Sequence, residues 1–173
     1  IGATKFGARA AAGNSVDDIR QLVDFARPYA VKVYVTLNTI IFDNELEEAY
    51  QLVDELQEAG VDALIVQDLA LLNCGKQIPL HASTQMDNRT PEKVAQLREM
   101  GFRQVVLARE LTLDEMREIH QRVPDVQLEA FIHGAICVSY NGQCYASQHC
   151  FGRSANRGEC AQFCRLPFDL VDE

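Results

Sequence analysis

Five of the six cysteines crowd into one short stretch near the C-terminal end of the chain. Their spacing, C-x6-C-x15-C-x3-C with one more cysteine between the second and third, brings several thiols within reach of one centre. It matches neither paired C-x2-C zinc knuckles nor the C-x2-C-x2-C run of bacterial ferredoxins. No secretory signal opens the chain, so metal ligation is favoured over disulfides, but the metal stays open. The four spaced cysteines are Cys137, Cys144, Cys160 and Cys164; Cys150 and the isolated Cys74 are predicted non-ligands.

Polar side chains follow each apolar run that has the character of a β-strand. Because the C-terminal ends of parallel strands meet on one face, these side chains are expected to line a common pocket. Imidazole, carboxylate and guanidinium groups there could move protons or bind anions. For each histidine, a hydrogen-bonded structural role is the alternative. The catalytic candidates are His81, Arg109, Glu110, Glu129 and His133, and the substrate-binding candidates at strand ends are Asn38 and Asp68.

The elements that must position these residues alternate along the chain as strands and amphipathic helices. Four helices carry start signals: Ser15, Asn44, Thr90-Pro91, and the capping box Thr112 with Glu115. Gly60 is expected to end the second helix. The expected strands are Val31 to Asn38, Ala63 to Asp68, Pro79 to Thr84, Gln104 to Glu110 and Val126 to Gly134, with a partial strand near Thr4 to Ala8.

This alternation predicts an α/β protein with a parallel, (β/α) barrel-like domain of the TIM-barrel type. A closed barrel has eight strands in about 250 residues, whereas five or six strands are predicted here. We therefore expect an incomplete barrel that lacks its first βα unit and its later ones. Residues 1–134 form the predicted partial barrel, and residues 135–173 form a cysteine-rich, metal-binding segment packed on the same domain.

The charge of the chain limits its partners. The net charge is −9 at pH 7, which repels nucleic acid over most of the surface, so any RNA contact must be local or come from elsewhere. Arg153, Arg157 and Arg165 outnumber Glu159 in the cysteine-rich segment, and Arg153 and Arg157 are candidates to bind phosphate or a carboxylate co-substrate. Solvated loop arginines are the alternative. No apolar run is long enough to cross a bilayer, and a cytoplasmic protein is expected.

Three motifs carry a resemblance to a known family. They are Glu129-x-Phe131-x-His133-Gly134-Ala135-x-Cys137, Gly142-x-Cys144-x-x-Ser147, and Gly158-x-Cys160-x-x-x-Cys164-Arg165. In these the chain resembles the collagenase-like peptidases, family 32 of the peptidases with unassigned mechanism, over essentially its whole length. The resemblance implies a barrel-like catalytic domain with a 4Fe-4S cluster held by four cysteines. Members of the family often have a further cysteine beyond the point that corresponds to residue 173, which leaves the fourth ligand open.

The members of this family differ in function. Some members are similar to oxygen-independent hydroxylases that help make 5-hydroxycytidine in ribosomal RNA or 5-hydroxyuridine in transfer RNA, with prephenate implicated as a requirement. The stretches from Ser139 to Cys144 and from Arg153 to Gly158 look most similar to the ribosomal RNA branch. The resemblance thus implies an iron-sulfur-dependent enzyme that hydroxylates RNA, with prephenate as co-substrate.

Two other functions stay open. A collagenase-like protease is the first, but the chain has no H-E-x-x-H helix motif and no G-x-S-x-G elbow. Cys137 could act as a nucleophile with His133 as its base, although a nucleophilic thiol cannot also bind a cluster. The second is a zinc-binding module without catalysis, since zinc accepts four thiolates readily.

Overall fold

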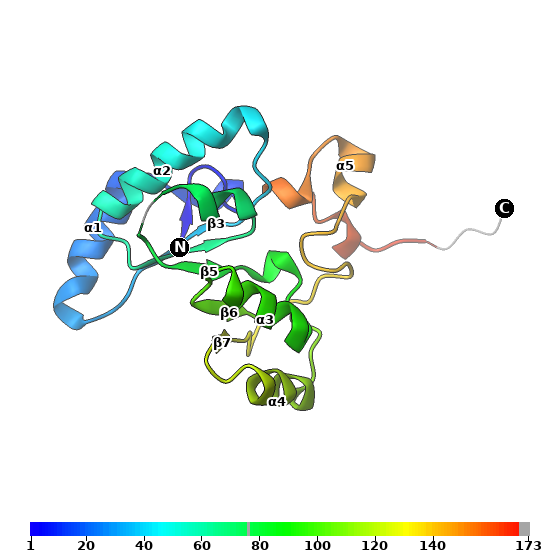
Figure 1. Ribbon diagram of the computed structural model, residues 1–173. Helices are drawn as coiled ribbons and strands as arrows, with labels where there is room; N and C mark the ends of the chain where they lie inside the picture. Colours follow the sequence, from blue (N-terminus) through cyan, green and yellow to red (C-terminus); the bar gives the residue numbers. More distant parts are fainter. Residues whose placement is uncertain (76, 170–173) are drawn as a thin grey trace.

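The computed structural model describes residues 1–75 and 77–169 and has an α/β fold built on one parallel sheet (Figure 1). The sheet has seven strands in the order β2-β1-β3-β4-β5-β6-β7, and every pairing is parallel. Among the described residues β2 and β7 are its edges, so the barrel-like arc is open. The strands are β1 (Gly2–Ala3), β2 (Gly13–Asn14), β3 (Tyr34–Leu37), β4 (Ala63–Val66), β5 (Leu80–Ala82), β6 (Gln104–Val106) and β7 (Gln127–Glu129).

Four amphipathic helices cover one face of this sheet. They are α1 (Val16–Ala26), α2 (Leu46–Glu58), α3 (Pro91–Glu99) and α4 (Leu113–Arg122), and α5 (Ala146–Phe151) lies apart from them. The start signals at Ser15, Thr90 and Thr112 are confirmed, because each side chain accepts a backbone N–H of the first helical turn. Each cap satisfies a donor that the helix itself cannot pair.

Several expected boundaries are wrong. Asn44 does not cap α2, because a 3-10 turn (Asp43–Glu45) precedes that helix and Glu45 accepts the N–H of Phe42 instead. The partial strand expected near Thr4 to Ala8 is absent; β1 comes earlier, at Gly2–Ala3. The strand β2 and the helix α5 were not expected from the sequence. Gly60, in the left-handed region at φ 80°, directly follows the C-cap of α2 as expected.

The two faces of the sheet differ in chemistry. Alternate residues of β3 and β4, such as Val35, Leu37, Leu64 and Val66, are fully buried against Ile19, Val53, Val94 and other helix side chains. The intervening residues point to the other face, where the register places Thr36, Ile65, His81 and Gln104 in one row. The apolar core therefore lies between the sheet and α1 to α4, and the helix-free face is largely polar.

The cysteine-rich segment, described here for residues 135–169, runs to the side of the sheet where the strands end. Figure 1 shows it leaving β7, forming α5, and ending away from helices α1 and α2. It also contains two 3-10 turns (Ala155–Arg157 and Phe163–Arg165). Residues 170–173, which the predicted segment includes, lie outside the described residues.

Candidate functional site at the strand ends

Residues after β3, β4 and β5 form a buried polar layer at the C-terminal ends of the strands. Asn38 donates from Nδ2 to Ser83 Oγ (3.2 Å) and accepts at Oδ1 from the N–H of Ala8 (2.9 Å). Asn88, which is completely buried, donates to the carbonyls of Ser83 and Val106. Amides that bridge neighbouring loops in this way hold the strand ends in one arrangement.

The cysteine-rich segment docks on this layer through two residues in succession. The carbonyl of Asn156 accepts the N–H of Ile40 (3.2 Å), and within the segment its Oδ1 accepts the N–H of Cys144 (3.3 Å). Arg157 donates to the carbonyl of Ile40 (2.8 Å) and to both carboxylate oxygens of Glu45 (2.8 and 2.6 Å). The Arg157 hydrogen bonds hold the pKa of Glu45 below its ordinary value. Arg157 is therefore already engaged by the protein.

Gly142 marks a second close approach between the segment and the strand ends. A Cβ atom at this position would lie 1.9 Å from the carbonyl oxygen of Gln85, and the residue has φ 73°. Beside it, Gln143 Nε2 donates to Asp87 (3.0 Å). Only glycine fits both the space and the backbone conformation, so this part of the segment is shaped to contact the loop after β5.

One of the predicted catalytic residues, His81, does not lie at a strand end, whereas Glu129 does. His81 is in the middle of β5, buried on the helix-free face, with its ring 4.8 Å from that of Tyr34 in an edge-on contact. Burial lowers the pKa of His81, and Lys32 adds to this effect. Glu129, the last residue of β7, accepts a hydrogen bond from Gln104, so it lies on the same face. His81 is followed by Ala82 within β5, so its side chain belongs to a face of the sheet.

The remaining predicted residues have different surroundings. Both carboxylate oxygens of Asp68 accept backbone N–H groups, from Ile41 (2.9 Å) and Ala70 (3.0 Å), which indicates a structural role. Arg109, which follows β6, donates to the carbonyl of Ala135 (3.3 Å) and stacks over the ring of Phe131 (4.3 Å). Glu110, His133 and Arg153 are exposed. A single pocket containing all the candidates is therefore not formed.

Sequence reasoning missed several residues that build this site. Arg89 stacks over the ring of Tyr140 (3.9 Å), and Asp87 contacts both Arg89 and Gln143. Buried polar atoms without a hydrogen-bond partner among the described residues include Gln67 Oε1 and Asn156 Nδ2. The polar run Asp87-Asn88-Arg89 in the loop after β5 was the available signal for part of this set.

The predicted metal ligands are free thiols. All six cysteines lie within the described residues and none is in a disulfide; Cys144 is half-buried, and Cys137, Cys160 and Cys164 are exposed. No three His, Cys, Asp or Glu side chains in residues 1–75 and 77–169 are grouped so that they could hold a metal ion. In this arrangement the thiols do not fit a cluster, so the four-cysteine set stays a prediction and no chemical step is derived through it.

Two cavities lie elsewhere in the molecule. One of about 240 Å³ is lined by Lys32, Val33 and Asp62, which precede β3 and β4, and the other, of about 290 Å³, is lined by residues of β1 and α2. Neither includes a predicted site residue. No helix of the described residues is long and apolar enough to span a membrane.

The comparisons with known proteins agree with this fold and these motifs. A family model for peptidase family U32 matches residues 1–173. The chain belongs to peptidase family U32. Its fold is also similar to the solved structure of the U32 peptidase Mk0906, with a TM-score of 0.63, 19% identity, and coverage of 75% of this chain and 58% of that one.

Curated relatives of this U32 chain include both RNA-modifying proteins and a protease. It is 56% identical to the 23S rRNA 5-hydroxycytidine C2501 synthase of Escherichia coli (strain K12), over 100% of this chain and 26% of that protein. It is 37% identical to the tRNA hydroxylation protein P1 of Bacillus subtilis (strain 168), over 98% and 41%. It is 34% identical to a collagenase of Porphyromonas gingivalis, over 96% and 43%. The chain thus spans a quarter to two-fifths of the length of these relatives.

Proposed function

We propose that this U32 chain is part of an enzyme that hydroxylates a pyrimidine base of RNA, with 5-hydroxycytidine in large-subunit ribosomal RNA as the product. The observation that carries the proposal is the 56% identity, over the whole chain, with a 23S rRNA 5-hydroxycytidine synthase. The tRNA hydroxylation protein at 37% identity supports the same class of reaction. RNA is then the partner and the cytoplasm the compartment.

We also propose that an iron-sulfur cluster takes part, with Cys137, Cys144, Cys160 and Cys164 as the ligand set and zinc as the alternative metal. The support is the number and type of the residues, since thiolates are the usual ligands of iron-sulfur clusters. Prephenate, a dicarboxylate, is the proposed co-substrate, and exposed Arg153 is a group that could pair with a carboxylate.

A pair of cysteine variants tests these proposals. Cys144→Ala should abolish both iron binding and the hydroxylated base, because a methyl group cannot replace a thiolate ligand. Cys150→Ala is the matched control: Cys150 is exposed on α5, in the same segment, and is a predicted non-ligand. Iron and sulfide assays on anaerobically purified full-length protein, with mass spectrometry of ribosomal RNA from cells carrying each variant, give the two readouts. Hydroxylated cytidine at wild-type level in cells carrying only Cys144→Ala would reject the role of this thiol.

The collagenase relative keeps a peptidase as the second candidate. The dyad it would need, Cys137 with His133, lies on an exposed loop, and no hydrogen bond joins the two side chains in the described part of the chain. Peptide cleavage by iron-free protein that is lost in His133→Gln would favour this candidate over RNA hydroxylation.

A further inference from the structure

Two guanidinium groups stack on exposed aromatic rings beside the strand ends. Arg109 lies 4.3 Å from the centre of the Phe131 ring, and its Nη1 donates to the carbonyl of Ala135. Phe131 is 48% exposed, and Tyr140, the aromatic residue of the second stack, is 55% exposed. In each stack the guanidinium group lies over the aromatic ring, and the rest of the ring is open to solvent.

The second stack is built in the same way on the neighbouring loop. Arg89 lies 3.9 Å from the centre of the Tyr140 ring and is itself fixed by Asp87. The N–H of Ala108 donates to the carbonyl of Asn88 (2.9 Å), so the residues that precede Arg109 and Arg89 are paired and the two stacks lie on adjacent loops of one surface. We call Arg89, Arg109, Phe131 and Tyr140 the stacking surface.

We propose that the stacking surface binds single-stranded RNA, with unpaired bases placed on Phe131 and Tyr140. This inference rests on the proposed function and names where the substrate strand is held. Bases of single strands stack on aromatic side chains and on arginine planes, which need no particular sequence. Between the two rings the chain exposes Ile132, Ile136 and Val138, apolar side chains that flat bases can also cover.

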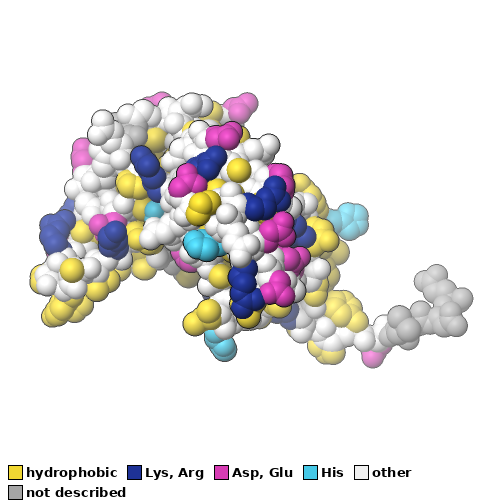
Figure 2. Space-filling view, turned by 60° about the horizontal axis from the view of Figure 1, so that its bottom comes forward, with side chains coloured by type: hydrophobic (Ala, Val, Ile, Leu, Met, Phe, Trp, Pro, Cys, Tyr) yellow, Lys and Arg dark blue, Asp and Glu magenta, His cyan; other side chains and the backbone are white. Residues whose placement is uncertain are grey.

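The charges on this surface favour stacking over backbone contacts. Asp87 neutralises Arg89, whereas no ion pair among the described residues involves Arg109. One free cation matches one phosphate, so log Kd should change with log salt by a slope of only about 0.7. The face formed by α3 and α4 mixes basic and acidic side chains, as Figure 2 shows, and offers no continuous basic stripe for a duplex. Single strands should therefore bind better than duplex RNA.

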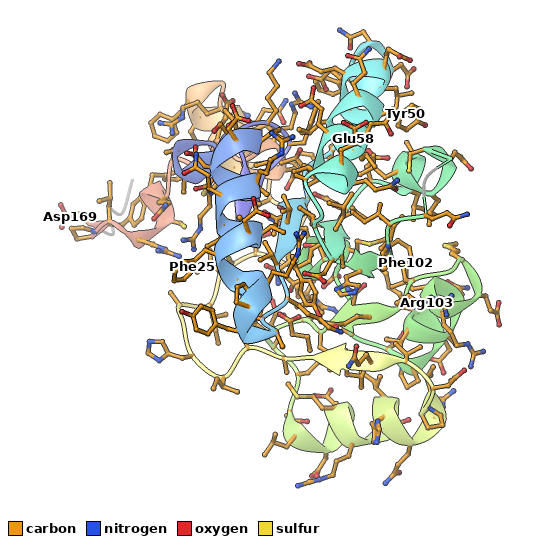
Figure 3. All side chains as sticks on the ribbon, turned by 90° about the vertical axis from the view of Figure 1, so that its left-hand side faces the viewer. Phe25, Tyr50, Glu58, Phe102, Arg103 and Asp169 are labelled. Carbon is orange, nitrogen blue, oxygen red and sulfur yellow. The ribbon has the colours of Figure 1, made fainter. Side chains whose placement is uncertain are left out.

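A pair of double variants tests the proposal with the full chain and a fluorescent, unstructured pyrimidine-rich RNA 12-mer. Phe131→Ala with Tyr140→Ala should weaken binding by at least about tenfold, as base-aromatic stacks do when truncated. Phe25→Ala with Tyr29→Ala is the matched control, because these residues are of the same types and are also exposed. Phe25 lies on α1, as Figure 3 shows, and α1 follows β2 at one end of the strand order, whereas Arg109 and Phe131 follow β6 and β7 at the other end.

Each outcome decides the proposal. Equal RNA affinity of the Phe131/Tyr140 variant and wild type, equal loss in the control, no RNA binding at all, or tighter binding of duplex RNA would overturn it. The proposal would also be overturned if the Phe131/Tyr140 variant changed its oligomeric state in sedimentation and kept its RNA affinity. The surface would then be a contact with a second copy of the chain. Ring-dependent RNA binding by a protein that yields no hydroxylated base would support the surface and count against the proposed function. Hydroxylated RNA together with binding that does not depend on the two rings would support the proposed function and count against the stacking surface.

Discussion

Arg157 connects the cysteine-rich segment to the loop after β3. It pairs with both oxygens of Glu45, donates to the Ile40 carbonyl and stacks over Phe42 (4.2 Å). Side chains of both charged partners are about three-quarters covered, so water screens the pair less than it screens a surface ion pair. The residue was predicted to bind substrate, but its donors are directed at the protein.

We expect Arg157→Gln to lower the free energy of unfolding by about 2 kcal/mol, because Glu45 would lose its charged partner while remaining largely covered. Arg153→Gln, four residues earlier and exposed, should change stability by less than about 0.5 kcal/mol. Urea unfolding followed by circular dichroism measures both. Equal effects of the two substitutions would contradict the role assigned to Arg157.

His81 makes stability depend on pH. Burial lowers the pKa of this imidazole, so the unfolded chain binds a proton more readily than the folded chain does below pH 6.5. The contribution of His81 is therefore complete above pH 6.5 and is lost as the pH falls, by up to about 1.4 kcal/mol per pH unit.

The prediction for His81 concerns the change in unfolding free energy between two pH values. From pH 7.5 to 5.5 the wild-type protein should lose more unfolding free energy than His81→Gln does, since glutamine does not take up a proton. His120→Gln, which replaces an exposed histidine of α4, should lose as much as wild type. Matching losses in wild type and His81→Gln would show that this imidazole is not the titrating group.

At the scale of elements, a glycine decides how closely the cysteine-rich segment approaches the loop after β5. Gly142 and Gly152 have similar φ values, 73° and 66°, but a Cβ at Gly142 would meet Gln85 O at 1.9 Å, whereas a Cβ at Gly152 meets nothing within 4 Å. Both alanine variants carry the strain of a left-handed residue, about 1 to 2 kcal/mol, and only Gly142→Ala adds a clash with backbone.

Gly142→Ala should therefore undock the segment while Gly152→Ala does not. Limited digestion with trypsin is a direct measure, because Arg157, which is largely covered in the docked segment, becomes accessible when the segment leaves the strand ends. We expect several-fold faster cleavage at Arg157 in Gly142→Ala and near wild-type rates in Gly152→Ala. Similar rates in both variants would mean that backbone strain alone, and not the contact with Gln85, controls docking.

The elements that were predictable are those whose signals are local. Ser15, Thr90 and Thr112 begin helices because each cap is made within the first turn, and the five longer strands lie inside the apolar runs that predicted them. Asn44 failed as a cap because it lies inside the 3-10 turn Asp43–Glu45, in which the Glu45 side chain accepts the N–H of Phe42. Glu45 also pairs with Arg157, more than a hundred positions away, a contact that no local pattern contains.

The candidate site was less predictable for the same reason. Asn38 and Asp68 were placed correctly after their strands, yet only the fold reveals that their polar atoms bind neighbouring loops. His81 belongs to a face of the sheet, since β5 continues one residue beyond it. Arginine stacks such as Arg89 on Tyr140 join residues from two distant stretches, and the sequence shows only that both are present.

At the scale of the whole molecule, the sheet and the cysteine-rich segment are held by different kinds of contact. The central strands β3 and β4 are buried beneath α1 and α2 and are paired on both sides. The segment is attached by polar contacts, chiefly those of Asn156, Arg157 and Gly142, and exposes many of its apolar side chains. Apolar burial is the larger source of stability, so the two parts should open at different free energies.

Native-state hydrogen exchange measures this difference directly. The amide of Leu64, which donates to Pro79 within the sheet, should exchange only through global unfolding, whereas the amides of Ile40 and Cys144, which donate to Asn156, should exchange through local opening at lower free energy. Arg157→Gln should lower protection by about 2 kcal/mol at all three amides, because local opening and global unfolding both break the contacts of Arg157. Equal opening free energies for Ile40, Cys144 and Leu64 in the wild-type protein would mean that the segment and the sheet unfold as one cooperative unit.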